Sequence, residues 1–401
     1  MEPLHALLEE LIHKGGSDLH LSAERQPMLR IDGDMTASSH SLLSHTEVNE
    51  MLRGIMDGRA SEEYKENSDT DFAYEIEDLA RFRVNVFEDR FGMGAVFRQI
   101  PSKVLSADEL NLSESVRDLC NLSKGLVLVT GPTGSGKSTT LAAMLDLINS
   151  SQSNHIITIE DPIEFVHKDK KCLINQRQIK DHTKSFAKAL RAALRQDPDI
   201  VMVGEMRDLE TIEIALETAE TGHLVFGTLH TTTAASTMDR IIDVFPAERQ
   251  NQIRSMLSNS LKAVIAQTLC KKIGGGRVAA LEILKVDHGI SALIRDGKIH
   301  QIPSAIQIGA SKGMCLLNTS LLQLVKEGTV EPREAYVKST DKEDLLASFC
   351  KAGLSVDFTI DCAQVPNAKL PLPVRSQEKA QVPEEKNVWG KKKNIKFGKK
   401  N

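Results

Sequence analysis

The sequence lacks an apolar run long enough to form a membrane-spanning helix. None of its stretches approaches the roughly 18 consecutive apolar residues that such a helix needs. The first residues also lack the basic segment that opens a secretory signal peptide, and their leucines recur instead at the spacing of one amphipathic helix face. We therefore expect a cytoplasmic protein.

Aromatic residues and closely spaced cysteines are also scarce. Aromatic side chains make up 4% of the 401 residues, the net charge is -5, and no basic, aromatic-rich stripe lies outside the C-terminal tail. These features argue against specific nucleic-acid binding. The six cysteines include no C-x-x-C pair, so the sequence indicates neither a zinc site nor a disulfide framework.

Acidic residues are absent from the last part of the chain, where residues 386–401 hold seven lysines. The composition predicts a disordered, solvated tail over residues 366–401. Attraction of this tail to an anionic partner is the alternative interpretation.

Residues 1–100 predict a small α+β domain with a mainly antiparallel sheet. After the first helix, extended segments on either side of Asp32 and Gly33 indicate a hairpin. Ser44 and Glu47 have the spacing of a capping box at the start of a second helix. Alternating apolar residues then indicate further strands.

Three arginines lie on these later strands. Arg81 and Arg83 share the polar face of a strand whose opposite face is apolar, because side chains alternate along a strand. Arg98 lies on the strand that follows. These side chains could be no more than the solvated face of a sheet.

From residue 115 to residue 365 the chain alternates strands and helices, which is typical of a three-layer α/β domain with a largely parallel sheet. Residues 101–114, which begin with Pro-Ser-Lys, are expected to be the linker. Short apolar runs predict strands at residues 125–130, 155–160, 199–203 and 223–229. In such sheets the chemistry belongs at the carboxyl ends of the strands.

A phosphate-binding motif directly follows the first of these strands. It matches the pattern G-x-x-x-x-G-K-[ST], in which glycines let backbone N–H groups close around phosphates. Lys137 is expected to reach the β- and γ-phosphates and Ser138 to bind Mg²⁺, at the positive end of the next helix. The candidate nucleotide-binding residues are Gly131, Pro132, Thr133, Gly134, Ser135, Gly136, Lys137, Ser138 and Thr139.

Carboxylates follow two more of the predicted strands. Glu205 could order Mg²⁺ or polarise the attacking water, or could be an acid favoured by a helix N-terminus. Glu160, Asp161 and Glu164 crowd another strand end, where like charges favour a bound Mg²⁺ over a plain solvated turn. The candidate metal ligands are Ser138, Glu160, Asp161 and Glu205.

Histidines lie at both ends of the strand at residues 223–229. His230, at the carboxyl end, could hydrogen-bond a γ-phosphate or an acidic neighbour. His223, at the start, is as readily explained by a structural role.

Four blocks, in this order, resemble the signatures of the secretion-type ATPases that power type IV pili and type II secretion. They are the phosphate loop, an acidic box, a strand with its glutamate, and a segment rich in threonine and histidine, at residues 131–139, 157–167, 197–208 and 218–231. The resemblance covers residues 1 to about 350.

The retraction branch of this family is the most similar. Assembly and secretion members usually carry an additional N-terminal domain and a tetracysteine zinc element, and neither is found here. Residues 290–303 are similar to a helical motif of pilus-retraction ATPases. The chain thus resembles type IV pilus retraction ATPases, in either their PilT-like or their PilU-like form.

The resemblance implies a RecA-like P-loop ATPase core and a PAS-like N-terminal domain, assembled as a homohexamer. It implies ATP and Mg²⁺ as cofactors and a motor that drives pilus retraction and twitching motility. The implied partners are an inner-membrane platform protein, through which the ATPase would sit peripherally at that membrane, and a paralogous retraction ATPase.

The resemblance also implies roles for single residues. Glu205 is the favoured catalytic base, Glu164 supports the metal and the water, and His230 senses the γ-phosphate. Arg81, Arg83 and Arg98 would close over the triphosphate, because a planar, permanently charged fork suits phosphate.

Other functions stay open on the sequence alone. A pilus assembly ATPase or a type II secretion ATPase would share the same core. A nucleic-acid translocase and a nucleotide-gated binding module without turnover are the alternatives from other classes.

Overall fold

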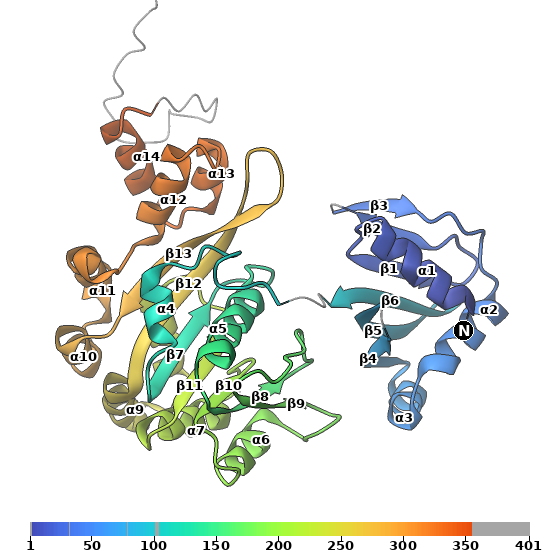
Figure 1. The fold of residues 1–401 in the computed structure, drawn as a ribbon, viewed down its shortest axis with the longest axis horizontal. Coiled ribbons are helices and arrows are strands. Elements are labelled where there is room, and N and C mark those ends of the chain that lie inside the picture. Colours follow the sequence, from blue (N-terminus) through green and yellow to red (C-terminus); the bar gives the residue numbers. More distant parts are fainter. Residues whose placement is uncertain (1, 32, 78, 101–103, 355–401) are drawn as a thin grey trace, which may run out of the picture.

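A computed structural model describes residues 2–31, 33–77, 79–100 and 104–354 of the chain (Figure 1). Asp32 of the expected hairpin turn, the first three residues of the expected linker and the whole of the expected tail lie outside these ranges. The described residues form two sheets, one before and one after residues 101–103.

The N-terminal region is an antiparallel sheet covered by helices. Its elements are α1 (Glu2–His13), β1 (Asp18–Ser22), β2 (Met28–Ile31), β3 (Asp34–Ala37), α2 (His45–Ile55), α3 (Gly58–Asn67), β4 (Asp69–Ile76), β5 (Ala80–Asp89) and β6 (Gly92–Ile100). The strands follow the order β3-β2-β1-β6-β5-β4, and each neighbouring pair is antiparallel. The predicted α+β character is confirmed.

Local signals explain these elements. Leu4, Leu7 and Leu8 are fully buried on one face of α1, as the spacing predicts. The capping box of Ser44 and Glu47 opens α2. Ile31 pairs with Asp34, so β2 and β3 form the predicted hairpin.

The second sheet is the core of the larger region. Its strands are β7 (Gly125–Thr130), β8 (His155–Glu160), β9 (Leu173–Gln178), β10 (Ile200–Val203), β11 (Leu224–Leu229), β12 (Leu261–Lys271) and β13 (Arg277–Lys285). They follow the order β13-β12-β7-β11-β10-β8-β9 and are parallel except for the antiparallel pair of β12 and β13.

Three of these strands were not among the predicted ones. Strand β9 has the polar sequence LINQRQ at the sheet edge, so it offers no apolar run. Strand β12 starts at the residue that follows the last residue of a helix, and no glycine or proline separates the two. Neither β9 as a whole nor the start of β12 therefore has a local signal in the sequence.

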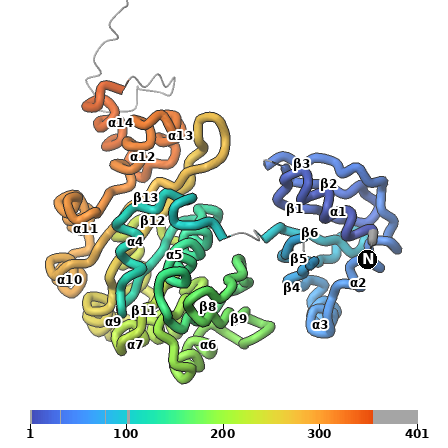
Figure 2. The backbone as a smooth tube through the Cα atoms, viewed as in Figure 1, coloured from blue at the N-terminus to red at the C-terminus, as the bar shows by residue number. Residues whose placement is uncertain are grey.

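Helices cover both faces of this sheet (Figures 1 and 2). The helices of the larger region are α4 (Glu114–Leu119), α5 (Lys137–Ser151), α6 (Phe186–Ala193), α7 (Leu209–Glu220), α8 (Ala234–Asp243), α9 (Ala247–Ser260), α10 (His288–Arg295), α11 (Ile302–Ile308), α12 (Leu317–Lys326), α13 (Pro332–Lys338) and α14 (Lys342–Lys351), with 3-10 turns η1 (Ile299–Gln301) and η2 (Gly309–Lys312). None of the described helices combines the length and apolar character that a membrane crossing requires.

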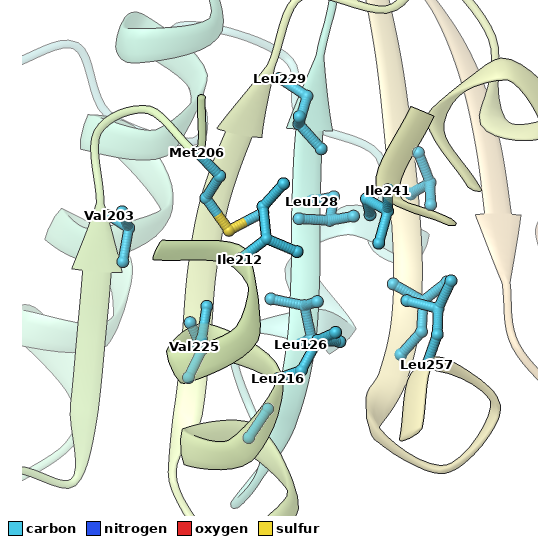
Figure 3. Packing of buried hydrophobic residues seen from close by; sticks show 14 of the residues in the cluster. Leu126, Leu128, Val203, Met206, Ile212, Leu216, Val225, Leu229, Ile241 and Leu257 are labelled. Atoms are coloured by element: carbon cyan, nitrogen blue, oxygen red, sulfur yellow. The ribbon is translucent and has the colours of Figure 1, made fainter. Parts of the chain in front are cut away.

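Alternating residues of β7 face opposite layers. Leu126 and Leu128 pack against α7, α8 and α9 (Figure 3), whereas Val127 and Val129 pack against α4 and α5. Both faces of β7 are buried, which explains why such strands appear in the sequence as continuous apolar runs. A smaller cluster joins α12, α13 and α14 to β12 and β13.

Residues 104–113 of the expected linker pack against the protein rather than crossing solvent. Residues 104–113 form turns rather than a helix or strand, but Ala107 and Leu112 are buried against α4 and α5. This segment therefore packs as part of the larger region.

Polar contacts join the two regions. Lys180 Nζ lies 2.9 Å from Glu63 Oε1, and Arg59 Nη2 lies 2.8 Å from Asp181 Oδ1. Arg81 Nη2 donates to Gln178 Oε1 at 3.5 Å. The first two contacts join α3 to the loop that follows β9, and the third joins β5 to the last residue of β9.

Candidate nucleotide-binding and catalytic site

The phosphate loop fills the interval between the end of β7 and the start of α5. Gly131, Gly134 and Gly136 have φ angles of 145°, 78° and 86°, which side-chain-bearing residues rarely adopt. A Cβ at Gly131 would lie 2.3 Å from the backbone oxygen of Gln267, and one at Gly136 would lie 2.8 Å from Gln267 Nε2. Gly131 is thus required by space as well as by conformation, whereas a side chain at Gly136 would have to displace the amide of Gln267.

Lys137 lies inside this loop. Its side chain is buried, and Nζ donates to the carbonyl oxygens of Gly131 at 2.9 Å and Pro132 at 3.2 Å. Burial lowers the pKa of Lys137, although the charges of Glu205 and Glu164 oppose that shift. Among the described residues, the buried hydroxyl of Ser135 has no hydrogen-bond partner. A cation and a free donor inside a glycine loop fit a phosphate group.

A pocket lies beside the first turns of α5, at the carboxyl ends of the parallel strands. It brings together Ser138, the acidic residues after β8 and the glutamate after β10; its polar and charged lining is Ser138, Glu160, Asp161, Glu164, His167, Glu205 and Thr228. The structure therefore gathers the candidate metal ligands and Glu164 in one pocket, although they come from the start of α5, from the end of β8 with its following loop, and from the loop after β10.

Glu205 is held from two sides. Its Oε1 lies 2.5 Å from Arg207 Nε and 2.9 Å from His230 Nε2. Burial alone would raise the pKa of Glu205, but the hydrogen bond from Arg207 and the charges of His230, Arg207 and Lys137 bring it below its ordinary value. Glu205 is therefore an ionised carboxylate at neutral pH, close to the phosphate loop.

The acidic box is built around a buried carboxylate. Glu160 accepts hydrogen bonds from Thr158 Oγ1 at 2.6 Å, Gln176 Nε2 at 3.1 Å and the backbone N–H of Glu164 at 3.3 Å. Burial raises the pKa of Glu160. Its oxygens are already engaged, so its geometry suits the shaping of the loop that presents Asp161 and Glu164 better than direct metal binding.

A Mg²⁺ ion fits this pocket through few protein ligands. Among the residues that the structure describes, no group of three or more His, Cys, Asp or Glu side chains is arranged to hold a metal. Mg²⁺ commonly keeps several waters and takes one or two protein ligands together with substrate phosphates. Ser138 with Glu205 or Glu164 nearby matches that requirement.

The two histidines have different surroundings. His230 contacts Glu205, as expected for an acidic neighbour, and is partly exposed. His223 Nδ1 lies 3.2 Å from the carbonyl oxygen of Thr218, which fits a structural role at the end of α7.

Two of the three N-terminal arginines, Arg83 and Arg98, are engaged within their own region. Arg98 Nε donates to Asp18 Oδ1 at 2.8 Å, and Arg83 Nε donates to the two oxygens of Asp71 at 3.2 and 3.0 Å. Arg83 alone of the three lines a second pocket, which it shares with Asp161. Arg81 contacts the larger region through Gln178, whereas Arg98 is not brought to the site.

Two residues of the site were not predicted. Arg207 lies in the block at residues 197–208 and was assigned no role, although its position two residues after Glu205 allows the contact. Gln267, on β12, contacts the phosphate loop from a distant part of the chain. A single amide inside the apolar run of β12 was the available signal.

A strand, a glycine loop and a helix in a parallel sheet, with a carboxylate at the end of a strand two places away in that sheet, define a RecA-like P-loop ATPase. Residues 1–334 match the family model described as "Type II/IV secretion system protein", and the chain belongs to that family.

Comparison with individual relatives identifies the branch of the family that this chain is similar to. The chain is 55% identical over 331 residues to the type IV pilus retraction ATPase PilT of Pseudomonas aeruginosa, covering 82% of this chain and 96% of the relative. It is 37% identical over 340 residues to the type IV pilus ATPase PilU of the same organism, covering 84% and 89%. A crystal structure of the pilus retraction motor PilT with bound ADP matches with a TM-score of 0.80 and 46% identity, covering 85% of this chain and 99% of that one. The chain is therefore a PilT/PilU-like ATPase.

Proposed function

We propose that this protein is the Mg²⁺-dependent, homohexameric ATPase that powers type IV pilus retraction, and with it twitching motility. The observation that carries the proposal is the pocket in which Ser138, Glu164 and Glu205 meet beside the phosphate loop. The similarity to PilT along nearly its whole length supports the biological setting.

ATP would occupy the phosphate loop at residues 131–139. Backbone N–H groups and the N-terminus of α5 would hold the phosphates, and Lys137 would exchange its carbonyl contacts for phosphate oxygens. Ser138 would bind Mg²⁺, with Glu205 and Asp161 acting on its water ligands. Bound Mg²⁺ would neutralise charge on the transferring phosphoryl group.

Glu205 is our candidate for the catalytic base. It is ionised, faces the pocket, and is oriented by Arg207 and His230. Glu164 lines the same pocket and would support the metal or the water. His230, through its contact with Glu205, would report whether the γ-phosphate is present.

Motion would arise from contacts that exist only with the γ-phosphate. Arg83 lies nearest to the acidic box, so it is the best placed of the N-terminal arginines to reach a triphosphate, in its own subunit or a neighbouring one. Arg81 and Arg98 would need a rearrangement. Loss of the γ-phosphate then removes contacts that favour the closed arrangement.

The relatives support a cellular setting for this motor. We propose a cytoplasmic ring that contacts an inner-membrane platform protein and works beside a paralogous retraction ATPase. The higher identity to PilT than to PilU favours the PilT-like role. Pilus assembly and type II secretion remain the alternative uses of the same motor.

Phosphate release with purified protein tests the enzymatic part. Hydrolysis should require Mg²⁺ and should be unchanged by added DNA. Stimulation by DNA that is lost steeply with salt would instead favour a nucleic-acid translocase, and nucleotide binding without turnover would favour a gated binding module.

A further inference from the structure

Gln267 lies on β12, at the first position beyond the strand's pairing with β7. The pairing ends where Ala266 faces Thr130, so Gln267 follows directly and reaches the phosphate loop. The side chain is 4% exposed. A buried amide must satisfy its hydrogen bonds inside the protein, and its partners therefore reveal what it holds.

Both polar atoms of this amide are engaged around the loop. Nε2 donates to the backbone oxygen of Ser135 at 2.7 Å, and Oε1 accepts from Thr140 Oγ1 at 2.8 Å. The assignment of the two atoms is unambiguous, because a carbonyl oxygen cannot donate. Gln267 thus joins the middle of the phosphate loop to the first turn of α5.

The bond to Ser135 fixes the direction of one peptide unit. In a planar trans peptide the carbonyl of Ser135 and the N–H of Gly136 point in opposite directions. Because the carbonyl points at Gln267, the N–H points to the other face of the loop. Gly136 has a φ of 86°, and glycine tolerates many backbone conformations, so the loop itself provides little resistance to rotation of this peptide.

We propose that Gln267 is a positioning residue for phosphate binding, which holds the Ser135–Gly136 peptide with its N–H toward the nucleotide. If the peptide rotated, a carbonyl oxygen would face the phosphates where a donor is needed, and anion binding would weaken. The inference rests on the proposed nucleotide site and adds a residue from outside the motif.

The test compares Gln267→Met with Thr140→Val. Methionine keeps the length of the side chain and removes the donor, whereas valine at residue 140 removes the other partner of Gln267 and leaves the bond to Ser135. Kd for ADP and for inorganic pyrophosphate is measured, the latter in competition with a fluorescent ADP, together with the Tm of the nucleotide-free protein.

We expect Gln267→Met to weaken ADP and pyrophosphate alike by about tenfold, the scale of one hydrogen bond to a charged group. Thr140→Val should change either Kd by less than about twofold. A loss of affinity for pyrophosphate equal to the loss for ADP is the informative result, because it places the defect at the phosphates. A general loss of stability would instead lower the Tm and would not act selectively on phosphate binding.

Gln267→Glu provides a second variant of unchanged size. An ionised carboxylate accepts but cannot donate to Ser135, so this change, measured at alkaline pH where a buried carboxyl is ionised, should weaken pyrophosphate more than methionine does. Wild-type affinity for pyrophosphate in either folded variant would overturn the inference. Failure of the wild-type protein to bind ADP would instead reject the nucleotide site itself.

Discussion

Replacement of Glu205 by glutamine separates catalysis from binding. In the structure, one oxygen of Glu205, Oε1, contacts both Arg207 Nε and His230 Nε2. A glutamine side chain retains one carbonyl oxygen that can accept from both, so the surrounding geometry should persist. What it loses is the negative charge and the ability to take a proton.

The expected loss in kcat is large. General bases typically contribute about 10²- to 10⁴-fold, which corresponds to about 3–5.5 kcal/mol of transition-state stabilisation. ADP binding should be equal or slightly tighter, because the charge of Glu205 lies near Lys137 and competes with phosphate for that cation.

The assay is phosphate release at saturating ATP, paired with a direct Kd measurement for ADP. Glu164→Gln is the matched control, since Glu164 lines the same pocket without contact to His230. It should reduce kcat less than Glu205→Gln does. The assignment is refuted if Glu205→Gln retains wild-type kcat, or if its ADP affinity falls in parallel with kcat, which would indicate a metal-binding or structural role.

Four further predictions concern other contacts, and the last of them concerns pH. Lys137→Ala should abolish hydrolysis and the rise in Tm with ADP together; a normal ADP-induced shift would reject the phosphate-loop assignment. Mixing Lys137→Ala with Arg83→Ala subunits should restore activity that neither variant has alone if Arg83 acts across subunits, and background activity in verified mixed rings would contradict that role. Glu282→Gln should lower the free energy of unfolding by about 1–3 kcal/mol, measured by thermal unfolding. The reason is that the buried carboxylate of Glu282 accepts from the N–H groups of Ala234 and Leu317, at the starts of two helices. An unchanged Tm would contradict this, because it would show that a glutamine amide satisfies both N–H groups equally well.

The pH dependence of the inter-region contact has a defined sign. The hydrogen bond from Lys180 lowers the pKa of Glu63 below its usual 4.5. A lowered pKa in the folded state means that the contribution is present above that usual value and is lost as the pH falls. Lys180→Met should therefore destabilise the protein at neutral pH by at most about 1 kcal/mol, and less under acid conditions. A constant difference in Tm across that range would show that the ion pair is not responsible.

The sequence predicted the parts of the fold that have local signals. The phosphate loop has a fixed spacing, the capping box pairs residues three apart, and the buried parallel strands are continuous apolar runs. The gathering of Ser138, Glu164 and Glu205 could also be anticipated, because the carboxyl ends of parallel strands meet at one edge.

Contacts that depend on long-range register could not be predicted. Nothing in the sequence near the motif shows that Gln267, 132 positions after Ser135, reaches the loop. The engagement of Arg83 with Asp71 depends on the pairing of β4 with β5, and the resemblance alone suggested a phosphate for that arginine. Strand β9 is polar and at an edge, so its periodicity was hidden.

The most direct test of the central claim is genetic complementation in the source organism. A strain that lacks this chain is supplied with the wild-type protein or with Glu205→Gln, and surface pili and twitching are scored together. A retraction motor predicts excess pili without twitching in the deletion strain and in the Glu205→Gln strain, and normal behaviour with the wild-type protein. A deletion strain without pili would identify an assembly motor, and unchanged piliation and twitching would contradict the account.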